Sequence, residues 1–179
     1  MRMREACHDE QVMDASLPFA FEDGWPMPLP GRVVRAQETS IALGLQMLGG
    51  FRTPLVDPST TLTVLVENGH VLSPPIALPE RVMSDPSDLQ EWIWDTHAAT
   101  GRLLVYPSDG SWWIVEDADW EVVFVCGAID FVERVSDAIW LDSWRLFDWL
   151  PLERLDPGAR DEARMLAARY DLPLATPGV

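Results

Sequence analysis

Three short apolar runs separated by tight turns constrain the fold of this chain more than any other feature. The runs cover residues 102–106, 112–116 and 120–126, and they are rich in aliphatic, β-branched and aromatic side chains. The turn at 108–111 contains Ser, Asp and Gly, and the turn at 117–119 is acidic. Strands joined by turns this short pair with their neighbours along the chain in antiparallel orientation. The sequence therefore predicts a meander of three antiparallel strands.

A hairpin is predicted upstream of the meander. Residues 61–67 are mostly β-branched or aliphatic, and they are followed by Asn68-Gly69, the strongest short signal for a hairpin turn. The return strand would run from His70 to Leu72. The sheet of the protein is therefore expected to contain this hairpin, at about 61–72, and the meander, at about 102–126.

Apolar residues recur at helical spacing in other segments, among them 36–48, 86–100 and the stretch that follows Asp156-Pro157. The last of these has the apolar stripe Ala163, Leu166, Ala167 and Tyr170. Residues 128–135 fit either a helix or a strand, and both alternatives stay open. Helices packed on an antiparallel sheet define the expected fold class, which is α+β.

Residues 17–31 have a composition that excludes a regular helix or a central strand. They contain four prolines, two glycines and three aromatic residues. We interpret them as an extended arm that lies against the domain through Phe19, Phe21 and Trp25; the alternative is a mobile tail. The chain then divides into an N-terminal segment, 1–31, which includes this arm, and a single α+β domain over 32–179.

Charge is unevenly distributed along the chain. All 13 basic residues are arginine, the 29 acidic residues give a formal net charge of −16, and residues 61–150 hold 16 of the acids but only 4 of the arginines. The same segment contains eight of the nine tryptophans. Such a segment can steer a basic partner by its negative field and anchor it through large rigid side chains. Binding to nucleic acid or to an anionic membrane is not expected, because both need basic patches.

Several features bear on location and redox state. No apolar run approaches the roughly 18–20 residues that span a bilayer, and residues 1–11 lack the apolar core of a secretory signal. We therefore expect a cytoplasmic protein. Cys126 ends an apolar run and should be buried, and a disulfide with Cys7 is not expected in a reducing compartment.

The chain lacks the motifs of the common enzyme classes. There is no lysine for a Schiff base or a phosphate-binding loop, and no nucleophile elbow, zinc-protease or CxxC motif. The histidines, His8, His70 and His97, are too far apart in sequence for a closely spaced pair of zinc ligands. We expect no catalytic residues, no metal and no cofactor. The alternative is a small enzyme or a metal- or ligand-binding domain that uses Asp or Glu with His70 or His97.

The candidate binding site is the acidic turn of the meander. Its residues are Glu116, Asp117, Asp119, Trp120 and Glu121. Four carboxylates within six residues exceed what the arginines of the segment can pair with. We therefore expect most of them to face solvent, to stay ionised and to bind a foreign cation, with Trp120 as an exposed anchor.

The stretch 102–131, RLLVYPSDGSWWIVEDADWEVVFVCGAIDF, resembles the small acidic immunity proteins of bacterial toxin–immunity pairs. The resemblance covers about thirty residues and has no family-specific motif, so no functional residue is carried over by position. It implies a cytoplasmic α+β domain without catalytic residues that caps a cognate toxin. The hypothesis is a non-enzymatic protein that neutralises a basic protein partner. An adaptor domain whose acidity reflects a GC-rich genome or a saline habitat is a further alternative.

Overall fold

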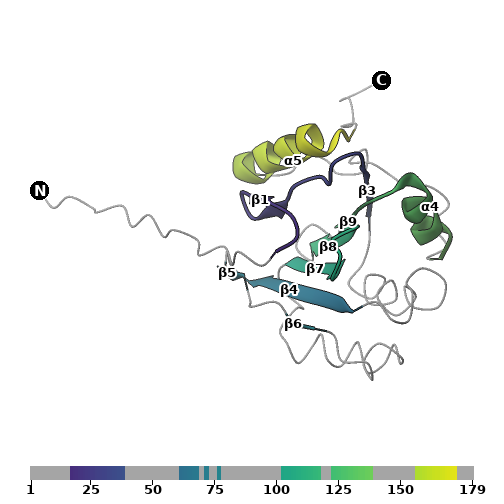
Figure 1. Cartoon of the computed structure of the whole chain (residues 1–179). Coiled ribbons are helices and arrows are strands. Elements are labelled where there is room, and N and C mark those ends of the chain that lie inside the picture. Colours follow the sequence, from purple (N-terminus) through teal and green to yellow (C-terminus); the bar gives the residue numbers. More distant parts are fainter. Residues whose placement is uncertain are drawn as a thin grey trace, which may run out of the picture.

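The computed structural model describes residues 17–38, 61–68, 71–72, 76–77, 102–117, 122–138 and 156–172. Within these residues, an antiparallel sheet is flanked by helices and by the N-terminal arm, which is an α+β arrangement (Figure 1). No helix in these ranges is long and apolar enough to cross a membrane.

Within the described residues, the sheet has seven strands in the order β3-β9-β8-β7-β4-β5, and β6 also pairs with β4. All of its pairs are antiparallel. The strands are β3 (Val33–Glu38), β4 (Leu62–Asn68), β5 (Val71–Leu72), β6 (Ile76–Ala77), β7 (Arg102–Pro107), β8 (Trp113–Asp117) and β9 (Val122–Gly127). Strands β7, β8 and β9 are consecutive neighbours, so the predicted meander is confirmed. The predicted hairpin is confirmed as well, because Asn68 of β4 pairs with Val71 of β5.

The prediction of a helix at 36–48 is wrong for its first three residues. Residues 36–38 belong to β3, in which Ala36 pairs with Phe124 of β9 and is buried. Pairing along the whole length of β9 therefore outweighs the helical spacing of the apolar residues. Residues 39–48 and the predicted helix at 86–100 lie outside the described residues.

The arm is ordered and contributes to the core. Its strands β1 (Phe21–Glu22) and β2 (Trp25–Pro26) form a small hairpin of their own. The Trp25 side chain is 0% exposed and meets Phe124 edge to face, with 5.3 Å between ring centroids. Phe19 and Phe21 pack against the same core. The interpretation of residues 17–31 as an arm anchored by three aromatic residues is confirmed.

Two helices follow β9 in the described residues. Helix α4 (Ile129–Ala138) settles the open alternative at 128–135 in favour of a helix. Helix α5 (Pro157–Tyr170) begins as predicted at Asp156-Pro157, where the Asp156 carboxylate accepts hydrogen bonds from the first-turn amides at 2.8 and 3.1 Å. Its predicted stripe, Ala163, Leu166, Ala167 and Tyr170, is buried.

The arm and α5 cover one face of the sheet, and α4 packs against the other (Figure 1). Trp113 shares the core of the first face with Tyr170 of α5, and its indole nitrogen donates to the Met27 carbonyl at 3.1 Å. Its neighbour Trp112 stacks on Phe131 of α4. Cys126 is buried on the first face, as expected from its apolar run.

Candidate functional site

Asp117, the last residue of β8, lies inside the protein. Its side chain faces the arm and α5, and the residue is 3% exposed. The opposite residue on β7 is Arg102, whose Nε donates to Asp117 Oδ2 at 2.9 Å. A carboxylate at this depth needs such a partner, because desolvating an isolated charge is costly.

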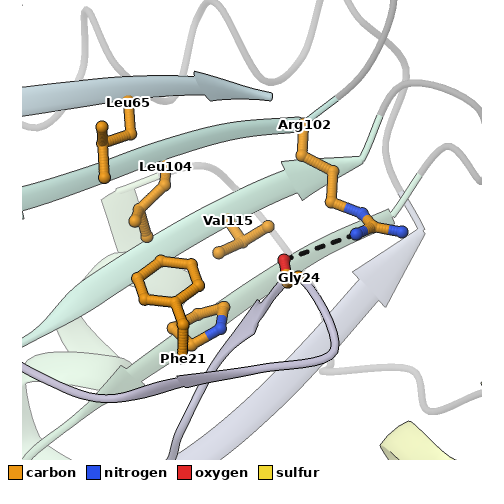
Figure 2. A pocket seen from close by; sticks show the side chains of 7 residues that line it. Phe21, Gly24, Leu65, Arg102, Leu104 and Val115 are labelled. Atoms are coloured by element: carbon orange, nitrogen blue, oxygen red, sulfur yellow. Dashed lines mark hydrogen bonds between the residues drawn. The ribbon is translucent and has the colours of Figure 1, made fainter. Parts of the chain in front are cut away.

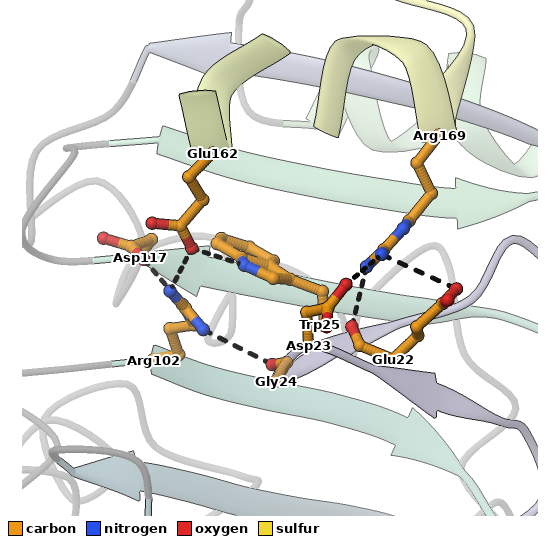
Figure 3. Close-up of polar contacts among 8 residues, drawn as sticks. All are labelled: Glu22, Asp23, Gly24, Trp25, Arg102, Asp117, Glu162 and Arg169. Atoms are coloured by element: carbon orange, nitrogen blue, oxygen red, sulfur yellow. Dashed lines mark hydrogen bonds and ion pairs between the residues drawn. The ribbon is translucent and has the colours of Figure 1, made fainter. Parts of the chain in front are cut away.

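Arg102 also joins the sheet to the arm and to α5 (Figure 3). One terminal nitrogen donates to Glu162 Oε1 at 2.8 Å, and the other donates to the Gly24 carbonyl at 3.4 Å. The guanidinium carbon lies 3.8 Å from the centre of the Trp25 ring, close enough for a cation–π interaction. Trp25 Nε1 donates to the same Glu162 oxygen at 2.8 Å. We call Arg102, Asp117, Glu162, Gly24 and Trp25 the Arg102 network.

The network holds two carboxylates around one guanidinium where β7, β8, the arm and α5 meet. The Arg102 side chain is 17% exposed, so its ion pairs are only partly screened by water. Removing one partner from a pair this deep leaves the other charge poorly solvated, at a cost of roughly 3–5 kcal/mol. The arrangement therefore stabilises the position of the arm and of α5 on the sheet.

Glu116 faces the opposite side of the sheet from Asp117, because successive residues of a strand alternate. Its neighbours across β7 and β9 are Leu103 and Val123, and both are buried. Burial in these surroundings, and secondarily the nearby charge of Asp117, raise the pKa of Glu116 from 4.5 to about 7. The Glu116 carboxyl group is therefore partly protonated at neutral pH.

These two positions depart from the expectation that most carboxylates of the acidic turn face solvent and stay ionised. Asp117 is buried and paired with Arg102, and Glu116 lies in an apolar environment on the other face. The two carboxylates cannot form one acidic surface. Asp119, Trp120 and Glu121 lie outside the described residues, and their role in binding stays a prediction.

Sequence reasoning did not find the residues that pair with Asp117. The meander gave a signal for Arg102, since antiparallel pairing of 102–107 with 113–117 places Arg102 opposite Asp117. No local signal pointed to Glu162 or Trp25, which reach the network from distant segments. His70 and His97, the histidines of the alternative hypothesis, lie outside the described residues.

A second arginine binds the tip of the arm hairpin to α5 (Figure 3). Arg169 of α5 donates to the Glu22 carbonyl at 2.7 Å and to Asp23 Oδ2 at 2.9 Å, and the Glu22 carboxylate lies 3.6 Å away. The side chains of Glu22 and Asp23 are 59% and 67% exposed. The backbone turns sharply at this point, with positive φ at Asp23 and Gly24. The hairpin tip therefore presents two carboxylates to solvent.

A small pocket opens between the arm hairpin and the sheet (Figure 2). Its lining includes Phe21, Gly24, Leu65, Arg102, Leu104 and Val115. The interior volume of about 10 Å³ holds about one water molecule, so this pocket does not enclose a substrate. Among the residues that the structure describes, no group of His, Cys, Asp and Glu side chains could hold a metal ion.

Comparison of the chain with protein families, with curated protein sequences and with solved structures finds no match.

Proposed function

We propose that this chain is a non-enzymatic binding protein that neutralises a basic protein partner, most concretely an immunity protein that caps a bacterial toxin. The observation that carries the proposal is the net charge of −16 in a chain whose only cations are arginines. A field of this sign attracts basic proteins and repels acidic ones.

The internal use of the arginines strengthens this argument. Arg102 and Arg169 pair with carboxylates across long sequence separations, and Arg134 and Arg164 pair with acids on their own helices. In the described part of the chain, these four arginines are therefore already paired with acids of the protein itself. Exposed acids in the described part of the chain include Glu22, Asp109, Glu133, Asp156 and Asp171.

The decisive experiment is capture of the partner followed by reconstitution. Immobilised protein should retain, from lysate of its native cell, a protein of high isoelectric point, and the retention should weaken as salt approaches physiological strength. The purified partner should then lose its activity on addition of one equivalent of this chain. A captured partner that is acidic, or one whose activity is untouched by the chain, would contradict the proposal.

One observation favours a second candidate, a small enzyme or ligand-binding domain that uses Asp or Glu with His70 or His97. A carboxyl group with a pKa near 7, such as that of Glu116, is suited to general acid catalysis. A ligand screen by thermal shift separates the two candidates. A small molecule that raises the Tm of the wild-type protein but not of the Glu116→Gln variant would favour the enzyme.

A further inference from the structure

The arm and α5 are bound to each other as well as to the sheet (Figure 3). Near the start of the helix, Glu162 accepts a hydrogen bond from the indole of Trp25 at 2.8 Å. About two helical turns later, on the same side of α5, Arg169 donates to the Glu22 carbonyl at 2.7 Å. The arm hairpin is therefore held by α5 at two points along the helix.

Each of these two elements supplies acceptors for buried donors of the other. The Tyr170 hydroxyl of α5 is buried and donates to the Pro26 carbonyl of the arm at 2.9 Å. If the arm left alone, this hydroxyl would lose its acceptor, and if α5 left alone, the indole of Trp25 would lose Glu162. A buried donor without an acceptor is costly, so each loss disfavours separate departure by roughly tenfold or more.

The arm and α5 also share their contacts on the sheet. The ring of Phe124 meets both Trp25 and Tyr170, with 5.3 and 5.4 Å between ring centroids. The guanidinium of Arg102 donates to one carbonyl of the arm and to Glu162 of α5. Departure of one element therefore opens to water the sheet residues on which the other element lies.

The arm ends at a turn that separates it from the sheet. The amide of Arg32 donates to the Leu29 carbonyl at 3.0 Å, and Gly31 within this turn has a φ of 67°. Strand β3 begins directly after the turn and pairs with β9 along its whole length. The backbone pairing of the sheet therefore does not depend on the arm.

We propose that the arm and α5 form one cover, which opens from the sheet and closes on it as a single cooperative unit while the strands stay paired. Opening exposes Trp113, Phe124 and Cys126, each of which is 0% exposed in the closed structure. Contiguous elements commonly open together in this way, at a lower free energy than global unfolding. The cover is independent of the partner's identity, so its failure would leave the proposed function standing.

Native-state hydrogen exchange of the intact chain tests whether the cover opens. The amide of Met27, which is hydrogen-bonded within the arm, reports on the arm. The amide of Leu166 reports on α5, and that of Val115 reports on β8. The first two should share one protection factor, about tenfold or more below that of Val115. The thiol of Cys126, followed by maleimide labelling and peptide mapping, should be protected to the same extent as the first two.

A charge-matched pair of substitutions tests whether the two elements open together. Asp156→Ala removes the N-cap of α5, whose carboxylate accepts from amides of that helix. This change should speed exchange in α5, exchange in the arm and labelling of Cys126 by the same factor, about threefold to tenfold. Asp161→Ala is the control, because it removes an exposed carboxylate that pairs with Arg164 of the same helix. It should change all three rates by less than about twofold.

Two results would overturn the single cover. If Asp156→Ala speeds exchange in α5 but leaves Met27 and Cys126 unchanged, the two elements open separately. If the wild-type amides of Met27 and Leu166 are protected as strongly as that of Val115, the arm and α5 leave the sheet only when the whole protein unfolds.

Discussion

Glu116 and Asp117 are consecutive residues of β8 that face opposite sides of the sheet. Asp117 pairs with Arg102 beneath the arm, whereas Glu116 lies between two aliphatic neighbours on the face against which α4 packs. The two acids therefore have different physical roles. Substitution of Asp117 tests an ion pair, and substitution of Glu116 tests a proton equilibrium.

Replacing Arg102 with Met should lower the free energy of unfolding by about 3–5 kcal/mol, because Asp117 and Glu162 lose their shared cation in a partly buried site. Urea unfolding followed by circular dichroism measures the change. Arg134→Met is the matched control, since its partner Asp130 is exposed, and it should cost less than about 0.5 kcal/mol. Equal losses in the two variants would contradict the role assigned to the Arg102 network.

The stability of the protein should depend on pH through Glu116. Its pKa is raised from 4.5 to about 7 in the folded state, so the folded protein binds more protons than the unfolded chain between these values. The contribution of Glu116 to the free energy of unfolding is therefore highest below pH 4.5 and falls as the pH rises through about 7.

Glu116→Gln should remove this contribution. Relative to wild type, the variant should gain stability as the pH rises from about 4.5 to above 7, because glutamine stays neutral. Urea midpoints measured across this range provide the comparison, and the difference between the two proteins cancels the titration of other groups. A constant difference at all pH values would show that Glu116 titrates normally.

Truncating Trp25 to Ala should destabilise the fold by about 3–5 kcal/mol, because a fully buried aromatic side chain is lost. Trp25→Phe should cost less, since it keeps the edge contact with Phe124 and loses the hydrogen bond to Glu162. Phe19→Ala, which removes a partly buried ring, is the control within the arm and should have a smaller effect than Trp25→Ala. Chemical denaturation of the three variants measures their free energies of unfolding and gives the order of the losses.

Partner association should respond differently to acids at the two ends of the acidic turn. Asp119→Asn with Glu121→Gln should slow association a fewfold at low salt and flatten its salt dependence, as expected for rim charges. Asp117→Asn should instead lower stability and leave the association rate of the folded protein nearly unchanged, because Asp117 is buried. Stopped-flow mixing with the captured partner distinguishes the two. If Asp117→Asn slows association as much as the double variant of Asp119 and Glu121 does, the conclusion that Asp117 acts only inside the protein is wrong.

The parts of the fold that could be predicted are those with strong local signals. The meander followed from short apolar runs between turns, and the start of α5 followed from Asp156-Pro157. The strand β3 could not be predicted in this way, because its pairing with β9 joins segments about ninety residues apart and overrides helical spacing at Ala36.

The candidate site was less predictable for a related reason. Composition predicted a surplus of carboxylates but not which of them are buried. Asp117 is buried and pairs with Arg102, and Arg102 in turn contacts Glu162 and Gly24 of the arm, which come from distant parts of the chain. Alternation along β8 separates Glu116 from Asp117, but the predicted strand ended at residue 116 and left Asp117 in the turn, so the sequence did not indicate this separation.

The bond between Trp25 and Glu162 spans 137 positions, and this separation has a consequence for biosynthesis. As the chain leaves the ribosome, the arm emerges long before α5. The indole of Trp25 therefore lacks its partner Glu162 until 137 further residues have been added, while β7, β8 and β9 can already pair through short turns. Nascent chains that stop before Asp156 would expose the aromatic residues of the arm and of the sheet beneath α5, which is apolar surface of the kind that makes incomplete chains prone to aggregate.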